Sequence, residues 1–319
     1  MLIEHSWWWP VARVEDVGPD PQALQLLGER LVLWKTAGGD LSLLTDRCPH
    51  RGARLSMGRV QGQSVQCPYH GWRFGADGQC VAIPAQPGFT PPDSSRACAH
   101  RLQLAHGLVW AALAVPQHPV PLLKGLPDRR LIYGPFDVAT SAPRAVENFL
   151  DTAHFAYVHE GWLGDAAHPE VPSYEVSHTD GGRPVIECYR AWQPRASASA
   201  QDGAWVEYRY EVLSPYAALL TKRGEQASMA QDSYVIWACP QTDGSCRLWF
   251  AQYTTDEQTP DDALRDFQLA IFAQDQPILE SQEPKALPLS GSEAMSAADR
   301  LSAAYRRYLK ACGIGAGVC

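Results

Sequence analysis

The stretch CPHRGARLSMGRVQGQSVQCPYHGWRF, residues 48–74, contains two short phrases that each pair a cysteine with a histidine. The first phrase supplies Cys48 and His50, and the second supplies Cys67 and His70. A proline follows each cysteine, and a glycine follows each histidine closely, so each loop is stiffened and can then bend tightly. Two loops that each present one thiol and one imidazole predict a metal centre held between them.

The order of the donors separates two kinds of metal centre. A zinc site usually takes two cysteines from one knuckle and two histidines from elsewhere. Here each loop offers one of each, as CxH and CxxH, which suits a [2Fe-2S] cluster with two thiolates on one iron and two imidazoles on the other. The candidate cluster ligands are therefore Cys48, His50, Cys67 and His70, and structural zinc is the alternative.

The two phrases together resemble the Rieske iron–sulfur motif, in the form found in Rieske non-haem iron oxygenases. Rieske proteins of respiratory complexes carry an extra cysteine in each loop, and this sequence has none at those positions. IPAQP at 83–87 is similar to the vanillate O-demethylase-like monooxygenases of the oxygenase family. The resemblance implies a soluble electron-carrying domain joined to a catalytic domain.

Composition limits the possible partners and locations of the protein. A formal net charge of -8 over 319 residues argues against a nucleic-acid partner. The longest apolar runs, such as 108–116, are far shorter than the roughly 20 residues needed to cross a membrane. The N-terminus lacks the features of a signal peptide, so we expect a cytoplasmic protein without a membrane span. Nine cysteines without a dense framework favour metal ligands and free thiols over disulfides.

Hydrophobic patterns predict an α+β chain of two domains. Residues 1–118 alternate short β-rich runs with turn residues, which predicts a small all-β antiparallel domain. A proline-dense passage follows, and residues 119–319 predict an antiparallel-sheet catalytic domain flanked by helices. The expected helices cover 144–159, about 260–280 with Thr259 as the cap, and Ser292 or Ser296 to Cys312. We expect the glycine-rich segment 313–318 to be a frayed tail.

The predicted helix over 144–159 carries a second set of candidate metal ligands. Asn148, Asp151 and His154 would share one helical face, but His159 would lie about 140° around from His154 on an ideal helix. The helix should therefore be distorted, and a π-bulge or a helix end after His154 would bring both imidazoles to one metal. Two histidines and one carboxylate form a facial triad that leaves open positions on Fe(II) for dioxygen.

The resemblance extends to this second centre. It implies a mononuclear Fe(II) site held by His154, His159 and Asp275, although Asp266, Glu280 and Glu283 are rival acids in the same region. The proline at 277 could turn the short Asp275 side chain inward. In the family, an aspartate at the position of Asp151 bridges a cluster histidine of one subunit, here His70, to His154 of its neighbour. Asn148 could tune this site by hydrogen bonding.

The function implied by the resemblance is that of an oxygenase component that uses O2 to hydroxylate, or to O- or N-demethylate, a small aromatic substrate. With no nicotinamide or flavin motif in the chain, a separate NAD(P)H reductase carrying flavin and an iron–sulfur centre would supply electrons. A homotrimer is implied as well. An aromatic-ring dihydroxylating dioxygenase is the nearest alternative, and a Rieske electron-transfer protein without oxygen chemistry is a different class. The substrate pocket would use apolar residues such as Phe155, Phe267 and Ile271.

Overall fold

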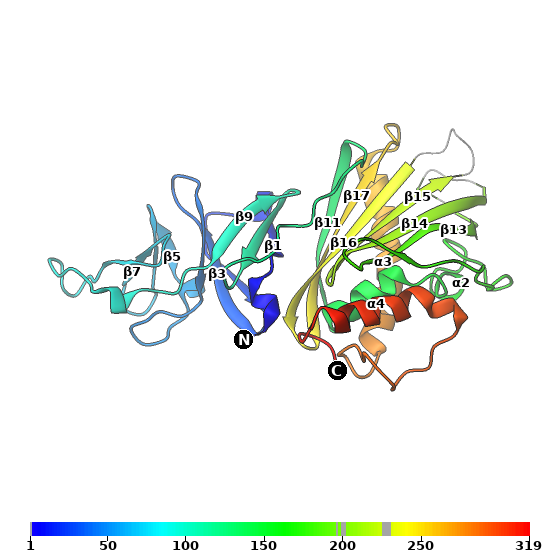
Figure 1. Cartoon of the computed structure of the whole chain (residues 1–319). Helices are drawn as coiled ribbons and strands as arrows, with labels where there is room; N and C mark the ends of the chain where they lie inside the picture. The colour runs from blue at the N-terminus through cyan, green and yellow to red at the C-terminus, as the bar shows by residue number, and fades with distance from the viewer. Residues whose placement is uncertain (1, 196, 199–201, 225–230) are drawn as a thin grey trace. The chain divides into compact units, whose positions relative to one another are not determined.

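The computed structural model describes residues 2–195, 197–198, 202–224 and 231–319. The chain divides into two compact units, Met1–Val120 and Pro121–Cys319 (Figure 1). Among the described residues, no helix combines the length and the apolar character that crossing a membrane requires. Each unit has its own antiparallel sheets, so the α+β architecture expected from the sequence is confirmed.

The first unit contains three small antiparallel sheets. The first sheet consists of β1 (Trp9–Arg13), β10 (Leu108–Ala112) and β9 (Arg101–Ala105). The second consists of β2 (Gln22–Leu26), β3 (Glu29–Lys35) and β4 (Leu41–Thr45). The third consists of β5 (Arg59–Gln61), β6 (Ser64–Gln66), β7 (Arg73–Gly75) and β8 (Cys80–Ala82). Short 3-10 turns connect them: η1 (Ile3–Ser6), η2 (Val14–Asp16), η3 (Leu55–Met57) and η4 (Asp93–Ser95). The first Cys/His loop precedes β5 in the sequence, and the second connects β6 to β7.

The second unit is built on one seven-stranded antiparallel sheet in the order β11-β17-β16-β15-β14-β13-β12. Its strands are β11 (Arg129–Val138), β12 (Ser177–His178), β13 (Pro184–Gln193), β14 (Ala204–Ser214), β15 (Ala217–Gly224), β16 (Gln231–Thr242) and β17 (Ser245–Thr254). The helices α1 (Ala142–Leu150), α3 (Asp261–Ser281) and α4 (Arg300–Ala311) pack against this sheet, and α1 also contacts α3 and α4 (Figure 1).

The helix predicted over 144–159 is interrupted earlier than expected. It begins after Ser141, whose hydroxyl accepts a hydrogen bond from Arg144 N, and α1 ends at Leu150. Asp151 is extended, and a four-residue helix, α2 (Phe155–Val158), follows. The prediction of a break after His154 was therefore wrong in its position. The cause is local, because the Asp151 carboxylate accepts from Ala153 N at 2.7 Å and competes with the helical backbone.

The late helix keeps its predicted extent but not its predicted cap. α3 begins at Asp261 and its N-cap residue is Pro260, whereas the Thr259 hydroxyl donates to the Asp256 carboxylate at 2.6 Å. The prediction that Thr259 caps the helix was therefore wrong. α3 also continues through Pro277 to Ser281. The expectation that Pro277 interrupts the backbone and so turns the Asp275 side chain inward was therefore wrong.

The C-terminal segment is docked rather than frayed. A 3-10 turn, η5 (Ala297–Asp299), begins with a capping box at Ser296 and leads into α4. The helix α4 ends before Gly313, whose φ angle is 68°. Beyond it, Cys319 N donates to Leu287 O at 3.0 Å, and Leu289 N donates to Cys319 O at 2.8 Å. The expectation of a free tail was wrong, since backbone pairing with 287–289 holds the segment in place.

A buried ion network joins α1, α4 and the segment between α3 and α4. The Arg306 guanidinium pairs with Glu147 at 2.6 Å and with Glu293 at 2.6 Å, and Arg144 pairs with Glu293 at 2.7 Å. Both arginines are buried. The residues between α1 and α2 follow directly after α1. By holding α1 in place, the network therefore fixes the point at which these residues begin.

Replacing Arg306 by leucine should destabilise the second unit by about 3–5 kcal/mol, because it leaves the Glu147 carboxylate, whose side chain is 14% exposed, without its paired cation, while Glu293 keeps only Arg144. Chemical denaturation followed by circular dichroism measures the change in the free energy of unfolding. The control is Arg247→Leu, which breaks the more exposed pair with Asp137 and should cost about 1 kcal/mol or less. Equal effects of the two substitutions would contradict this account of the network.

Candidate functional site

The two Cys/His loops of the first unit share one backbone geometry. In the first loop, Cys48 N donates to Ala53 O at 2.8 Å and Gly52 N donates to Cys48 O at 2.9 Å. The same two bonds recur around Cys67, at 2.8 and 3.1 Å. Gly52 and Gly71 have φ angles of 74° and 72°, which favour glycine. The sequence therefore folds both phrases into equivalent backbone turns, with the histidine two residues after the cysteine in the first loop and three residues after it in the second.

The side chains of these loops form a donor set suited to an iron–sulfur cluster. Cys48 and Cys67 are each 2% exposed, and burial raises the pKa of Cys48 to about 11. Thiolates at such a place need a bound cation to be stable. The rings of His50 and His70 lie 4.6 Å apart, and His50 stacks on Trp72 at 4.5 Å. Two buried thiols and two neighbouring imidazoles fit the mixed ligand set of a Rieske cluster.

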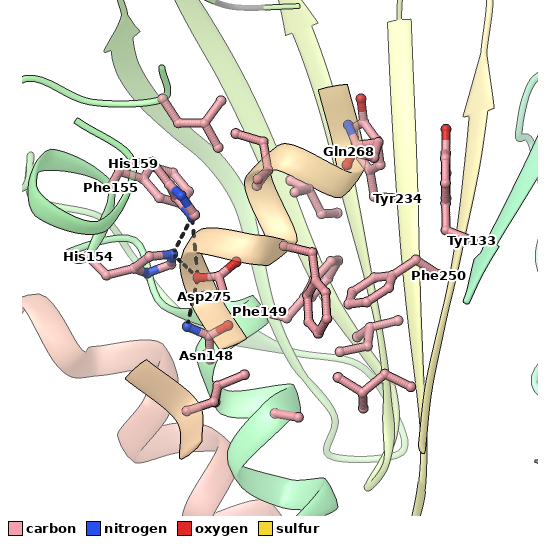
Figure 2. A pocket seen from close by; sticks show the side chains of 18 of the residues that line it. Tyr133, Asn148, Phe149, His154, Phe155, His159, Tyr234, Phe250, Gln268 and Asp275 are labelled. Carbon is pink, nitrogen blue, oxygen red and sulfur yellow. Dashed lines mark hydrogen bonds and ion pairs between the residues drawn. The ribbon is translucent and has the colours of Figure 1, made fainter. Parts of the chain in front are cut away.

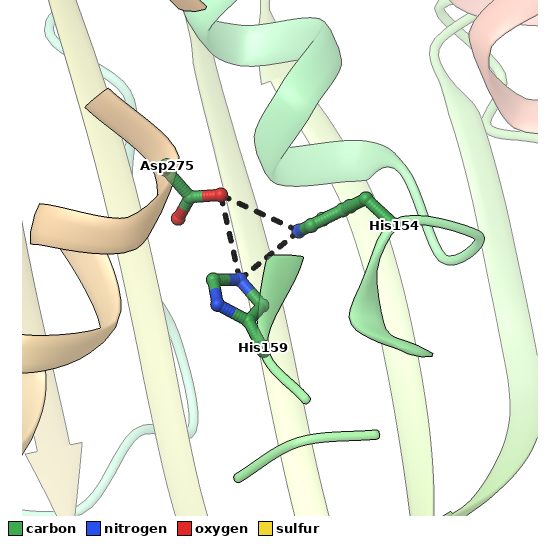
Figure 3. A group of neighbouring side chains, drawn as sticks. All are labelled: His154, His159 and Asp275. Atoms are coloured by element: carbon green, nitrogen blue, oxygen red, sulfur yellow. Dashed lines mark hydrogen bonds and ion pairs between the residues drawn. The ribbon is translucent and has the colours of Figure 1, made fainter. Parts of the chain in front are cut away.

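In the second unit, His154, His159 and Asp275 come together (Figure 3). The two Nε2 atoms of the histidines lie 3.1 Å apart, and Asp275 Oδ1 lies 3.5 Å from His154 Nε2 and 3.4 Å from His159 Nε2. His159 is 1% exposed and Asp275 is 8% exposed. Two imidazole nitrogens and one carboxylate oxygen that converge in this way fit one divalent metal ion with open positions.

The break between α1 and α2 creates this arrangement. His154 lies in the irregular turn before α2, and His159 follows the last residue of α2. Asp275 reaches the histidines from α3 (Figure 3). The three rival acids have other surroundings. Asp266 is exposed. Glu280 accepts hydrogen bonds from the Gln276 side chain and from Ala139 N, and Glu283 pairs with Lys285.

Asp151 and Asn148 each contact one member of the triad. Asp151 Oδ2 lies 3.3 Å from His154 Nδ1, on the opposite side of the ring from the triad. Burial opposes charge on His154, but the hydrogen bond with Asp151 and the charges of Asp275 and Asp151 raise the pKa of His154. Asn148 Nδ2 donates to Asp275 Oδ1 at 3.3 Å. Asp151 therefore orients His154, and Asn148 restrains the carboxylate.

Gln274 is a site residue that sequence reasoning missed. His159 Nδ1 lies 2.8 Å from Gln274 Oε1. Since a glutamine Oε1 only accepts, the proton of this bond belongs to His159 Nδ1, which leaves Nε2 free as a donor to a metal. The only signal in the sequence is that Gln274 adjoins Asp275.

A pocket opens from the triad between the sheet and α3 (Figure 2). Its volume is about 940 Å³ when the adjoining space open to solvent is counted. Phe155, Phe267 and Ile271, expected from the sequence to line a pocket, do so. Most of the remaining lining is aromatic or aliphatic: Tyr133, Phe136, Phe149, Leu163, Tyr208, Tyr210, Leu220, Tyr234, Ile236, Leu248, Phe250, Phe272 and Leu279.

Each of the two units matches a known protein family. Residues 7–111 match the family model of the Rieske [2Fe-2S] domain, and residues 138–313 match that of the vanillate O-demethylase oxygenase C-terminal domain. The second model begins just before α1 and ends just after α4, so it covers both the residues between α1 and α2 and the helix that carries Asp275.

Relatives align over almost the whole chain. Methylxanthine N1-demethylase NdmA of Pseudomonas putida is 31% identical over 95% of this chain and 87% of its own. Methylxanthine N3-demethylase NdmB of the same species is 30% identical over 97% of this chain and 89% of its own. The solved structure of NdmA from P. putida CBB5 with caffeine aligns with a TM-score of 0.83 at 28% identity, over 96% of this chain and 90% of that one. The chain therefore belongs to the Rieske non-haem iron oxygenases, in the group that carries the vanillate O-demethylase type of catalytic domain.

Proposed function

We propose that this oxygenase component removes a methyl group from nitrogen or oxygen of a small aromatic or heteroaromatic substrate. The observation that carries the proposal is the position of His154, His159 and Asp275 at one end of a largely apolar, aromatic-lined pocket. Relatives named as N-demethylases support the reaction type. The ring of a planar substrate would pack among Phe149, Phe155 and Phe250.

We assign the metal ligands from the two donor sets. Cys48, His50, Cys67 and His70 would hold the [2Fe-2S] cluster, and the triad would hold the mononuclear iron. When bound, the iron supplies the activation of O2, with electrons that arrive through the cluster. The chain contributes the orientation of the ligands: Gln274 fixes the tautomer of His159, Asp151 fixes the ring of His154, and the apolar pocket wall limits the access of water to the methyl group.

Loss of formaldehyde follows from hydroxylation of a methyl carbon attached to nitrogen or oxygen. Insertion of one oxygen atom of O2 into a C–H bond gives a hydroxymethyl group, and the second oxygen atom leaves as water with two electrons and two protons. The hydroxymethyl adduct then breaks its C–N or C–O bond and releases formaldehyde. The electrons come from NAD(P)H through a separate flavin and iron–sulfur reductase, so we expect the system to work in the cytoplasm.

We also propose a homotrimer in which the Asp151 carboxylate joins the two metal centres of neighbouring subunits. Asp151 contacts His154 through one oxygen, and its side chain is 30% exposed. A histidine of the cluster, His70, is exposed on the first unit. A carboxylate that accepts a hydrogen bond from an imidazole N–H on each side would link the two centres.

The reaction type can be tested by product analysis. The reconstituted oxygenase, with a reductase and NAD(P)H, should release one formaldehyde for each substrate consumed when offered N-methylated or O-methylated aromatics under ¹⁸O2. Trapped formaldehyde should carry the label when exchange with water is controlled. Formation of a cis-diol without formaldehyde would contradict demethylation and favour ring dihydroxylation. Electron transfer without substrate-dependent O2 uptake would favour a carrier.

The ligand assignment can be tested by metal content. Asp275→Asn should lower the iron content from about three to about two atoms per chain, because the cluster is retained while the facial triad loses its charged ligand. The visible spectrum reports the cluster independently. Asp266→Asn, an exposed acid on the same helix, should keep all the iron. Full iron content in Asp275→Asn would contradict the assignment.

The role of Gln274 can be tested by iron affinity. Gln274→Met removes the acceptor for His159 Nδ1 and should weaken binding of Fe(II) by about 10–100-fold, measured by competition with a chelator. Gln276→Met, on the same helix but bonded to Glu280, is the matched control. Unchanged affinity in Gln274→Met would show that the tautomer of His159 is fixed in another way.

A further inference from the structure

A second group of polar residues lines the pocket away from the triad. Tyr133, Tyr234 and Gln268 are separated from His154 and Asp275 by the aromatic side chains of the pocket (Figure 2). Lys222 is also among the lining residues. The catalytic assignment uses none of these four side chains. A pocket with a reactive end and a separate polar end can hold a substrate in one orientation.

A buried glutamine organises this polar end. The Tyr133 hydroxyl donates to Gln252 Oε1, and Gln252 Nε2 donates to Asp232 Oδ1 and to the Tyr234 hydroxyl oxygen, both at 3.2 Å. Gln252 is 1% exposed, so its amide has little freedom to turn. The network holds the two tyrosine hydroxyls at the pocket wall in defined directions.

Two opposite charges lie at this end, Lys222 in the pocket lining and Asp232 just outside it. Lys222 on β15 and Asp232 on β16 are direct partners in the register of these strands, and they are 7% and 6% exposed. Burial lowers the pKa of Lys222 to about 8, while the negative charge of Asp232 acts to raise it. The ammonium form therefore still predominates at neutral pH. A cation and an anion side by side leave this end of the pocket close to zero net charge.

The charge pair of Lys222 and Asp232 determines which polar groups of a ligand can bind at this end of the pocket. A carboxylate placed here would be attracted by Lys222 but repelled by Asp232, and it would also lose its hydration on entering an apolar pocket. An uncharged carbonyl needs only a donor, such as the Lys222 ammonium. An uncharged N–H needs only an acceptor, such as the Tyr133 oxygen, whose own proton is given to Gln252.

We propose that Lys222, Tyr133 and Tyr234 form the recognition end of the pocket and that, with Asp232 beside Lys222 and outside the lining, they select an uncharged amide or lactam edge, a C=O beside an N–H, over a carboxylate. The proposal rests on the proposed function, which makes this pocket the substrate site. It assigns the substrate class as N-methylated or O-methylated rings with an uncharged carbonyl and N–H edge, and it excludes methoxylated aromatic acids as preferred substrates.

The test compares two probes of almost the same shape, 4-methoxybenzamide and 4-methoxybenzoate. Their dissociation constants are measured by calorimetry on the anaerobic, iron-loaded protein at neutral pH. The wild-type protein should bind the amide at least about tenfold more tightly. In Asp232→Asn the Lys222 cation loses its opposing charge, so the preference should fall at least about tenfold through a gain in carboxylate binding. Asn can keep the hydrogen bond from Gln252.

Asp137→Asn is the matched control, because Asp137 lies on the same sheet but pairs with the Arg247 side chain and not with a residue that lines the pocket. It should keep the wild-type preference within about twofold. Lys222→Gln provides a second variant should Asp232→Asn not fold, and it should increase the preference for the amide because only Asp232 remains charged.

Equal or tighter binding of the benzoate by the wild-type protein would overturn the proposal, and so would a preference that Asp232→Asn leaves unchanged. These outcomes are separate from failure of the proposed function. Formaldehyde release from 4-methoxybenzoate alone would contradict the recognition end while supporting demethylation. Absence of formaldehyde from every methylated probe that binds would contradict demethylation while leaving the measured preference in place.

Discussion

The convergence of His154, His159 and Asp275 depends on the end of one helix. Had α1 continued through residue 159, the two imidazoles would point in directions about 140° apart and could not share a metal. The Asp151 carboxylate binds Ala153 N and ends the helical hydrogen bonding there. The same residue contacts His154 through its other oxygen. One aspartate thus shapes the backbone and orients a candidate ligand.

The buried charges of the second unit serve two separate purposes. The network of Arg144, Glu147, Glu293 and Arg306 joins the helices to the segment that follows α3, and it positions the start of the ligand-bearing region. Lys222 lines the pocket instead, and Asp232, its partner in the register of β15 and β16, lies beside it, where the pairing keeps the local net charge low. Aromatic side chains lie between this end of the pocket and the triad (Figure 2).

The sequence predicted the parts of the site that depend on short spacing. The four candidate cluster ligands lie in two phrases whose proline and glycine positions set the turns, and the structure shows the two turns to be equivalent. Asp275 required the family resemblance, because an acid on a helix is usually solvated. Gln274, Lys222 and Asp232 could not be found in this way, since their roles arise from strand register and side-chain direction. The docked tail was missed because its partner, 287–289, is distant in the sequence.

The central claim is that two iron centres share this polypeptide, one in each unit. A crystal structure of the iron-loaded protein, with anomalous difference maps collected on both sides of the iron absorption edge, tests it most directly. The account predicts one iron peak among Cys48, His50, Cys67 and His70, and a second peak bound by His154, His159 and Asp275. A second peak at other residues, or a triad whose imidazoles point away from each other with no iron between them, would contradict it.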